Sequence, residues 1–343
     1  MPEHDHIDQP GLTTSAQPDS ARRRQLIGLA AGSALLAGSL TRPARAQTYP
    51  ARPISLIVPF GPGASTDNQF RALAQLASKE LGQNIVVTNK PGVNGTLGPS
   101  TMAQTSPPDG YSLSVIPSTL FRIPHLQRVS WDPLRDFSYV IGLTTYTFAV
   151  AVRADAPWKT LADLIADAKA NPEKITYGTS GRGGTGHIAM ERLSRLAGFK
   201  MNLVPFKGAS EFMPALVGGH IDVVADAGWG TLASAGRVRL LTVMTPQRLP
   251  SFPDVPTLKE QGHDLTAMSM LGIGGPKGMD PAVVKVLHDA FRKASRDPAF
   301  QRVLFADNQP EIYMDSEAFR KYAAEQYEID RKAVQELGLG PTG

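Results

Sequence analysis

Short β-rich runs alternate with segments of helical periodicity along most of this 343-residue chain, from Pro53 onward. In the first part we predict strands over residues 54–60, 85–88 and 111–116, separated by a helix over 67–81 and a short helix that ends near 104. Parallel strands need a crossover connection, usually a helix, and this spacing supplies one. The pattern therefore predicts an α/β fold that begins with a βαβαβ half.

A second set of alternating elements begins near Tyr146 and indicates a second sheet. The predicted strands cover residues 146–152, 175–178, 203–206, 221–225 and 240–244, and the predicted helices 161–170, 187–196 and 211–217. A strand over 268–274 and helices over 281–295, 298–305 and 316–337 complete the chain. The length exceeds that of one ordinary core, so we expect two lobes with doubly wound sheets and a helical C-terminal tail. Lobe 1 would comprise residues 47–147 and 265–343, and lobe 2 residues 148–264, with hinge crossings near Tyr146 and Leu265.

Composition excludes several classes of protein. Hydrophobic residues make up 42% of the chain and charged residues 19%, as in an ordinary globular protein. The formal net charge of +4 is too small and too dispersed for a protein that binds nucleic acid. The chain has no cysteine, which excludes disulfides, thiolate nucleophiles, cysteine-ligated zinc and iron–sulfur clusters.

The N-terminal segment has the features of a signal peptide. Three arginines, Arg22 to Arg24, precede an apolar stretch over residues 26–40 and an A-x-A cleavage site that ends at Ala46. We therefore predict a Tat-like signal peptide over residues 1–46, cleaved after Ala46, and export to the periplasm. A Sec signal and an uncleaved anchor are the alternatives, although the stretch is short for a membrane span.

Three junctions between a predicted strand and a helix share Gly-rich and hydroxyl-rich character. They cover residues 59–67, 178–187 and 205–210. In parallel α/β sheets these junctions lie at the carboxyl ends of strands, where the free N–H groups and the dipole of the next helix favour an anion. Possible hydroxyl donors are Ser65, Thr66, Ser180, Thr185 and Ser210. Tight turns and N-caps use the same residues for structural reasons, so one loop alone would not indicate a ligand.

Signatures of enzymes are weak in this sequence. Gly181, Gly183 and Gly186 satisfy the nominal dinucleotide pattern G-x-G-x-x-G. The next predicted strand, however, ends in Phe206-Lys207, where a nicotinamide enzyme should offer an acidic residue to the ribose. There is no G-x-S-x-G elbow, no Walker lysine and no H-E-x-x-H motif. We therefore expect no catalysis and no cofactor, and an exported nucleotide-dependent oxidoreductase is the less favoured alternative.

Five further residues have both a structural and a functional interpretation. His187 and Glu191 are one helical turn apart and could ligate a metal, but no third ligand is evident, so we expect no metal site. Asp67 is first a candidate N-cap, and Asp226 is first a turn residue. Trp229 fits a core position as well as a pocket wall.

Several short motifs, in order, resemble the Bug family of extracytoplasmic solute receptors, which serve tripartite tricarboxylate transporters. The resemblance covers essentially the whole chain after Tyr49. Its landmarks lie at residues 57–60 and 67, 89–92 with 94–95, 108–111, 177–178 with 180–181, 205–208, 218–222 and 252–257.

This resemblance implies a two-lobed periplasmic-binding-protein fold of type II, the Venus-flytrap fold, without catalysis or cofactor. It also implies that main-chain N–H groups and hydroxyls hold a ligand carboxylate, while the far end of the ligand sets specificity. The ligand-binding residues expected on this basis are Phe60, Gly63, Ser65, Thr66, Asp67, Ser118, Thr119, Ser180, Gly181, His187, Phe206, Lys207, Gly208 and Asp226.

Three departures from the family pattern bear on the ligand. The first loop has Gly61-Pro62-Gly63-Ala64 instead of Pro-Pro-Gly-Gly, and Phe206 replaces a usual tyrosine. Arg182 stands where a small polar residue is common, and we include it in the expected ligand-binding site. Its side chain could bind a second carboxylate of the ligand or point into water. Phe206 and Trp229 would suit an aromatic acid.

The partners implied by the resemblance are a small-molecule carboxylate and the subunits of a membrane permease. A sensor kinase of a two-component system is an alternative partner, because either protein would respond to the same closure of the lobes. No nucleic acid is expected, and a monomer is the default for such receptors.

Overall fold

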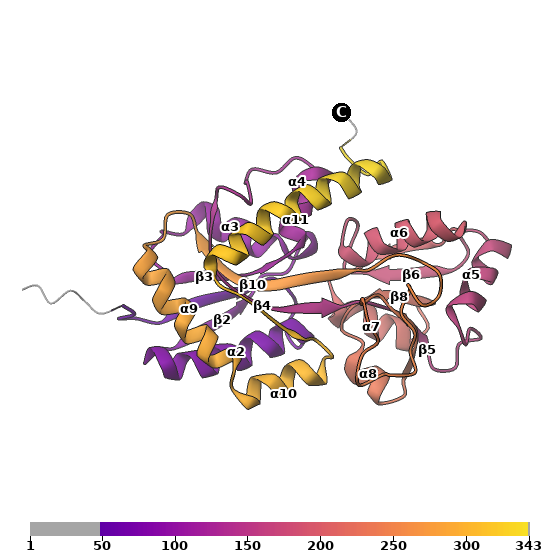
Figure 1. Ribbon diagram of the computed structural model, residues 1–343, viewed down its shortest axis with the longest axis horizontal. Helices are drawn as coiled ribbons and strands as arrows, with labels where there is room; N and C mark the ends of the chain where they lie inside the picture. The colour runs from indigo at the N-terminus through magenta and orange to yellow at the C-terminus, as the bar shows by residue number, and fades with distance from the viewer. Residues whose placement is uncertain (1–48, 342–343) are drawn as a thin grey trace, which may run out of the picture. The chain divides into compact units, whose positions relative to one another are not determined.

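The computed structural model describes residues 49–341, and the predicted signal peptide lies outside this range. The described chain contains two β-sheets, which Figure 1 shows with their covering helices. Within residues 49–341, no helix combines the length and the apolar character needed to cross a membrane.

The first sheet has six strands in the order β11-β4-β10-β3-β1-β2. Strand β1 (Ile54–Val58) pairs in parallel with β2 (Ile85–Asn89) and β3 (Ser112–Pro117), which confirms the predicted βαβαβ half. Strand β10 (Met268–Pro276) runs antiparallel to β3 and β4 (Phe137–Thr147), and β11 (Glu311–Met314) runs antiparallel to β4. The sheet is therefore mixed instead of wholly parallel. Its helices are α2 (Ser65–Leu81), α3 (Leu97–Thr105), α4 (Thr119–Leu126), α9 (Pro281–Ser295), α10 (Pro298–Ala306) and α11 (Ser316–Leu337).

The second sheet has five strands in the order β7-β6-β8-β5-β9. Its middle strands β6 (Thr176–Thr179) and β8 (Val223–Asp226) are parallel, whereas β5 (Ala149–Arg153) runs antiparallel to both β8 and β9 (Val238–Val243). Strand β7 (Asn202–Pro205) is parallel to β6. The helices here are α5 (Leu161–Ala170), α6 (Thr185–Ala197), α7 (Ala209–Val217) and the short α8 (Gly230–Ser234).

The chain passes between the two sheets twice. Strand β4 ends at Thr147 and β5 begins at Ala149, so Phe148 alone separates them. The return runs over residues 244–267, between β9 and β10. The sequence pattern placed these passages near Tyr146 and Leu265, while the boundaries of the two lobes stay a prediction.

Each sheet is buried by apolar helix faces. In the first sheet, Ile54, Leu56 and Val58 have no exposed surface, and α2 covers them with Phe70 and Leu73. Separate apolar clusters cover the two faces of the second sheet. Burying a side chain of this size stabilises a fold by about 1.5–3 kcal/mol. These clusters fix both sheets, and therefore the strand ends that surround the site.

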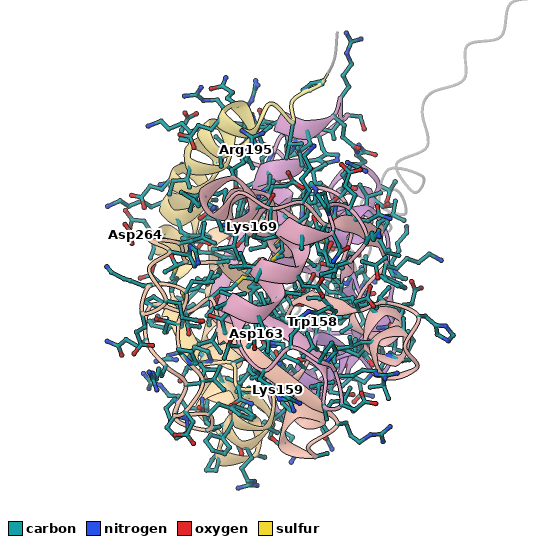
Figure 2. All side chains as sticks on the ribbon, turned by 90° about the vertical axis from the view of Figure 1, so that its right-hand side faces the viewer. Trp158, Lys159, Asp163, Lys169, Arg195 and Asp264 are labelled. Atoms are coloured by element: carbon teal, nitrogen blue, oxygen red, sulfur yellow. The ribbon has the colours of Figure 1, made fainter. Side chains whose placement is uncertain are left out.

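Two local contacts position elements that the strands alone do not fix. Helix α5 begins with a capping box, in which the Thr160 hydroxyl accepts a hydrogen bond from the N–H of Asp163 and the Asp163 carboxylate accepts one from the N–H of Thr160. Arg195 of α6 donates hydrogen bonds to the carbonyl oxygens of Glu336 and Leu337, at 2.9 and 2.5 Å, and so ties α6 to the end of α11. Asp163 and Arg195 are labelled in Figure 2.

Five elements differ from the sequence expectation. Strand β4 begins at Phe137 and β5 is a separate strand, whereas a single strand was expected over residues 146–152. Helices α4 and α8 and strand β11 were not predicted. Helix α4 contains Pro124 and β11 has only four residues, so neither gives a clear periodic signal.

Candidate functional site

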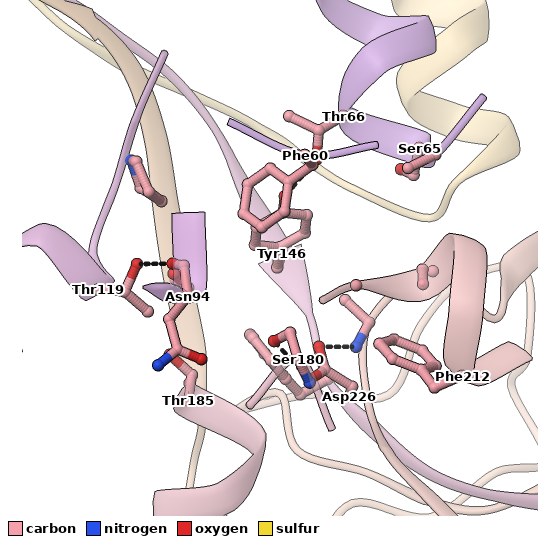
Figure 3. A pocket seen from close by; sticks show the side chains of 18 residues that line it. Phe60, Ser65, Thr66, Asn94, Thr119, Tyr146, Ser180, Thr185, Phe212 and Asp226 are labelled. Atoms are coloured by element: carbon pink, nitrogen blue, oxygen red, sulfur yellow. Dashed lines mark hydrogen bonds between the residues drawn. The ribbon is translucent and has the colours of Figure 1, made fainter. Parts of the chain in front are cut away.

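A small cavity lies where the two sheets face each other, and residues of both sheets line it (Figure 3). The volume of this cavity is about 40 Å³. Apolar and hydroxyl side chains dominate its wall. The lining residues are Phe60, Ala64, Ser65, Thr66, Asn94, Pro117, Thr119, Tyr146, Phe148, Ser180, Thr185, Gly208, Ala209, Phe212, Asp226, Ala227, Gly228 and Ser269.

The first residues of four helices line this cavity. They are Ser65 of α2, Thr119 of α4, Thr185 of α6 and Ala209 of α7. The first turn of a helix has N–H groups without an intrahelical partner, and its end of the helix dipole carries a partial positive charge. Four such ends around one cavity create a favourable environment for an anion.

Asp67 shapes the first loop instead of facing the cavity. It is the third residue of α2, and Ala64 occupies the N-cap position, so the N-cap interpretation was wrong. Its carboxylate accepts hydrogen bonds from the N–H of Gly63 at 2.9 Å, from Arg71 at 2.9 Å and from Asn89 at 2.7 Å. Burial raises the pKa of Asp67, but these three partners outweigh it and leave the pKa below its usual value.

Thr66 and Tyr146 form a pair of hydroxyls at the cavity wall. They share a short hydrogen bond in which either oxygen can donate. Burial raises the pKa of Tyr146, so its hydroxyl stays protonated at neutral pH. The hydroxyls of Thr66 and Tyr146 carry two protons, and the hydrogen bond between them takes up one of these protons. The pair therefore keeps one O–H free to donate into the cavity.

The hydroxyl of Ser65 is already saturated by protein partners. It donates to Asp307 Oδ2 at 2.7 Å and accepts from the amides of Gln69 at 2.9 Å and Gln309 at 3.1 Å. These bonds connect the start of α2 to the turn that follows α10. Ser65 can thus offer its backbone N–H to a ligand, but not its hydroxyl proton.

Asp226 ends β8 and lies at the cavity wall with 5% of its surface exposed. Its Oδ2 accepts from the N–H of Ser180 at 2.8 Å and from the Ser180 hydroxyl at 2.9 Å, while Oδ1 accepts from the N–H of Ala227 at 2.8 Å. Burial raises the pKa of Asp226, and the hydrogen bonds oppose this shift. Since the proton of Ser180 points to Asp226, this hydroxyl presents only lone pairs to a ligand.

Asn94 reaches from the first sheet to the second loop of the other sheet. Its side-chain amide donates to the carbonyl oxygen of Arg182 at 2.8 Å, and its backbone carbonyl accepts from the Thr119 hydroxyl at 2.7 Å. Val93 and Asn94 both have positive φ angles, 48° and 54°. A β-branched residue such as Val93 adopts this conformation at a cost in free energy.

His187 is buried behind the cavity wall and does not line it. Its Nδ1 accepts from the N–H of Gly183 at 3.0 Å, and its Nε2 lies 3.7 Å from Glu191. Burial, together with the charges of Arg182 and Arg122, lowers the pKa of His187 to about 4. No group of three or more His, Asp or Glu residues within residues 49–341 could hold a metal ion. His187 therefore shapes the second loop as a neutral hydrogen-bond acceptor.

The nominal dinucleotide pattern has a packing explanation. A Cβ atom at Gly186 would lie 1.9 Å from the carbonyl oxygen of Ala225, because α6 crosses β8 closely at this point. Gly181 and Gly183 have positive φ angles, 120° and 82°, which favour glycine in the loop. These three positions fit the close approach of loop and helix to the sheet.

The structure brings about half of the predicted site residues to the cavity. Those that line it are Phe60, Ser65, Thr66, Thr119, Ser180, Gly208 and Asp226. Those that do not are Gly63, Asp67, Ser118, Gly181, Arg182, His187, Phe206 and Lys207. Trp229 is buried in the core against Phe252 and is not part of the wall.

Several residues outside the wall have clear partners of their own. The Ser118 hydroxyl bonds to Met270 O and Tyr322 OH, on the side of α11. The ring of Phe206 packs edge-on against Phe212, which is itself in the wall. Lys207 and Arg182 are exposed. The cavity therefore draws on only part of each loop that the motifs indicated.

Sequence reasoning did not assign several lining residues to the site. Thr185 was considered as a hydroxyl donor, and the Asn-Gly pair at residues 94–95 is a turn signal that could have directed attention to Asn94. Tyr146 and Phe148 lie in the predicted strand over residues 146–152. The remaining lining residues that were not assigned are Ala64, Pro117, Ala209, Phe212, Ala227, Gly228 and Ser269.

Comparison with known proteins places this site in a family. The profile of the tripartite tricarboxylate transporter family receptors matches residues 69–339. The chain belongs to this receptor family. The receptor is 42% identical to a UPF0065 protein of Cupriavidus necator over 324 residues, which is 93% of this chain and 98% of the relative.

Solved structures give the same fold. The periplasmic binding protein BugD superposes with a TM-score of 0.81 at 27% identity, covering 85% of the receptor and 99% of BugD. An R. palustris protein solved with adipate superposes with a TM-score of 0.80 at 27% identity, with the same coverage. The receptor has the two-lobed α/β fold of periplasmic binding proteins, and it is a solute-binding receptor.

Proposed function

We propose that this receptor captures a small organic acid in the cavity between its sheets and delivers it to a membrane permease. The observation that carries the proposal is the convergence of the helix starts at Ser65, Thr119, Thr185 and Ala209 on one cavity. Neutral N–H and O–H donors there can bind a carboxylate without a cationic side chain.

Two hydroxyls are placed to complete the donor set. The Thr66–Tyr146 pair keeps one proton free, and the Thr185 hydroxyl accepts from Arg122 at 3.1 Å, which leaves its own proton for a ligand. The similarity to the R. palustris protein solved with adipate supports a carboxylate ligand.

Export and partners belong to the same proposal. The predicted signal peptide over residues 1–46 and the similarity to periplasmic binding proteins support a periplasmic location. The family description supports a tripartite permease as partner. In this proposal the protein acts as a monomer and catalyses no reaction. A sensor kinase as partner stays the alternative, and genes next to this one would distinguish the two.

Calorimetric titration of the purified protein with a panel of carboxylic acids tests the proposal. Binding of at least one acid is the expected result, and the Thr66→Val/Tyr146→Phe double variant should weaken it by about 1–3 kcal/mol, because both hydroxyl donors are lost at nearly constant volume. Thr105→Val is the matched control, since the Thr105 hydroxyl bonds only to the Thr101 carbonyl of its own helix. If no acid bound and a nucleotide did, the result would contradict the proposal.

A further inference from the structure

The cavity wall contains one acidic side chain and no basic one. Asp226 is the acidic residue, and none of the 18 lining residues is Lys, Arg or His. The favourable field for an anion therefore comes only from helix starts and neutral donors. Each helix start supplies about half of a positive charge, and this field falls off within the first turn.

The cationic side chains on the loops and helices that border the cavity are paired with carboxylates or exposed, and none belongs to the wall. Arg122 is buried, but its Nε pairs with Asp330 at 2.8 Å, so its charge is neutralised. Arg71 pairs with Asp67 at 2.9 Å. Arg182 and Lys207 are exposed, and neither belongs to the wall.

About half of the hydroxyl protons of the wall are also committed. Ser65 donates to Asp307, Thr119 to the carbonyl of Asn94 and Ser180 to Asp226. The side-chain donors that remain are the Thr66–Tyr146 pair and the hydroxyls of Thr185 and Ser269. The backbone N–H groups of the helix starts add to them.

The rest of the wall is apolar or rich in acceptors. The ring of Tyr146 packs edge to face against Phe60 and Phe148, with ring centroids 6.2 and 6.0 Å apart. Phe212 also lines the cavity (Figure 3). A second carboxylate in this space would lose its hydration without a cationic partner, and it would face Asp226. Burying an unpaired charge is costly.

We propose that this receptor selects monocarboxylates with a short, uncharged body and discriminates against di- and tricarboxylates. The inference rests on the proposed function, since it names the class of acid that the same cavity takes. It sets this receptor apart from its relative solved with the dicarboxylate adipate.

Matched pairs of acids of equal chain length test the selectivity. We would titrate the full chain calorimetrically at about pH 7.5, where both carboxyls of a diacid are ionised. The pairs are butyrate with succinate, pentanoate with glutarate, and hexanoate with adipate. In the pair that fits best, the monoacid should bind at least about tenfold more tightly than the diacid.

The outcomes separate this inference from the proposed function. A diacid that binds as tightly as its matched monoacid, or more tightly, overturns the selectivity but leaves a carboxylate receptor. Loss of that diacid binding in Arg182→Ala would then identify the missing cation. Silence from both members of every pair would instead count against the proposed function itself.

A charge variant tests the role of Asp226 directly. Asp226→Asn removes the negative charge at nearly constant volume, so the preference for the monoacid should fall by about threefold or more. Asp264→Asn is the matched control, because the Asp264 side chain is 93% exposed and lies outside the cavity wall (Figure 2). An unchanged preference in a folded Asp226→Asn protein would show that Asp226 does not set the selectivity. Should this variant not fold, the matched pairs with the unmodified protein still decide.

Discussion

Arg122 of α4 donates a hydrogen bond of 3.1 Å from Nη1 to the hydroxyl oxygen of Thr185, the first residue of α6. Arg122 is 4% exposed, and its Nε pairs with Asp330 of α11, which is 2% exposed. One buried cation therefore joins two helices of the first sheet to a helix start that faces the ligand cavity.

Replacing Arg122 should destabilise the protein strongly. Arg122→Met leaves the buried Asp330 carboxylate without its cation, so we expect the free energy of unfolding to fall by about 3–5 kcal/mol. Denaturant unfolding monitored by circular dichroism measures the change. In the Arg122→Met/Asp330→Leu double variant most of the loss should return, because no unpaired charge remains. An equal loss in both variants would show that the ion pair is not the cause.

Gly186 is expected to tolerate no side chain. A Cβ atom there would lie 1.9 Å from the carbonyl oxygen of Ala225, so Gly186→Ala must push α6 away from β8. We expect a loss of about 3 kcal/mol or more in unfolding free energy. Arg192→Ala, at an exposed position of the same helix, should change stability by less than about 0.5 kcal/mol. A fully stable Gly186→Ala protein would contradict this close packing.

Ser65→Ala should affect stability more than it affects affinity for an acid. The Ser65 hydroxyl bonds to Asp307, Gln69 and Gln309. Gln69 and Asp307 also bond to each other, so removal of the hydroxyl leaves the buried Gln309 amide unpaired, at a cost of about 1–3 kcal/mol. Thermal unfolding and calorimetric titration of the same preparation separate the two effects. Unchanged stability combined with lost acid binding would mean that the hydroxyl serves the ligand instead.

His187 should make stability dependent on pH in the mildly acidic range. An unfolded histidine titrates near pH 6.5 and the native His187 near pH 4. Between these values the unfolded state binds more protons, so stability rises with pH and this contribution is complete above pH 6.5. The full difference is about 3 kcal/mol. The slope should disappear in His187→Gln, whose side chain can still accept from Gly183; a slope that persists would point to other titrating groups.

Local sequence patterns predicted much of the fold. Period-two burial in β1 and the apolar face of α2 gave the βαβαβ half, because these residues pack against each other within a short stretch of chain. The antiparallel placement of β10 beside β3 and β4 is a long-range pairing, and no local pattern encodes its direction. The short strand β11 pairs with β4 over a similar sequence distance.

The site was predicted less completely than the fold. The three loops that the motifs indicated border the cavity. Asp67 and His187, however, hold the first and second of these loops by accepting hydrogen bonds from Gly63 and Gly183. Asn94 and Tyr146 are part of the cavity wall because the cavity forms where the two sheets meet. Which side of a loop faces a cavity depends on this meeting, and the spacing of residues along the chain does not determine it.

Phe148 has a double position, as the single residue between β4 and β5 and as part of the cavity wall. A one-residue connection leaves few backbone torsions about which the two halves can turn, so a change in their angle must pass through the torsions of Phe148 and its neighbours. A solute that presses on this ring therefore acts on the pivot itself. Binding of a solute in the cavity would thus be coupled to the angle between the two halves. A partner protein could detect this angle without contacting the solute.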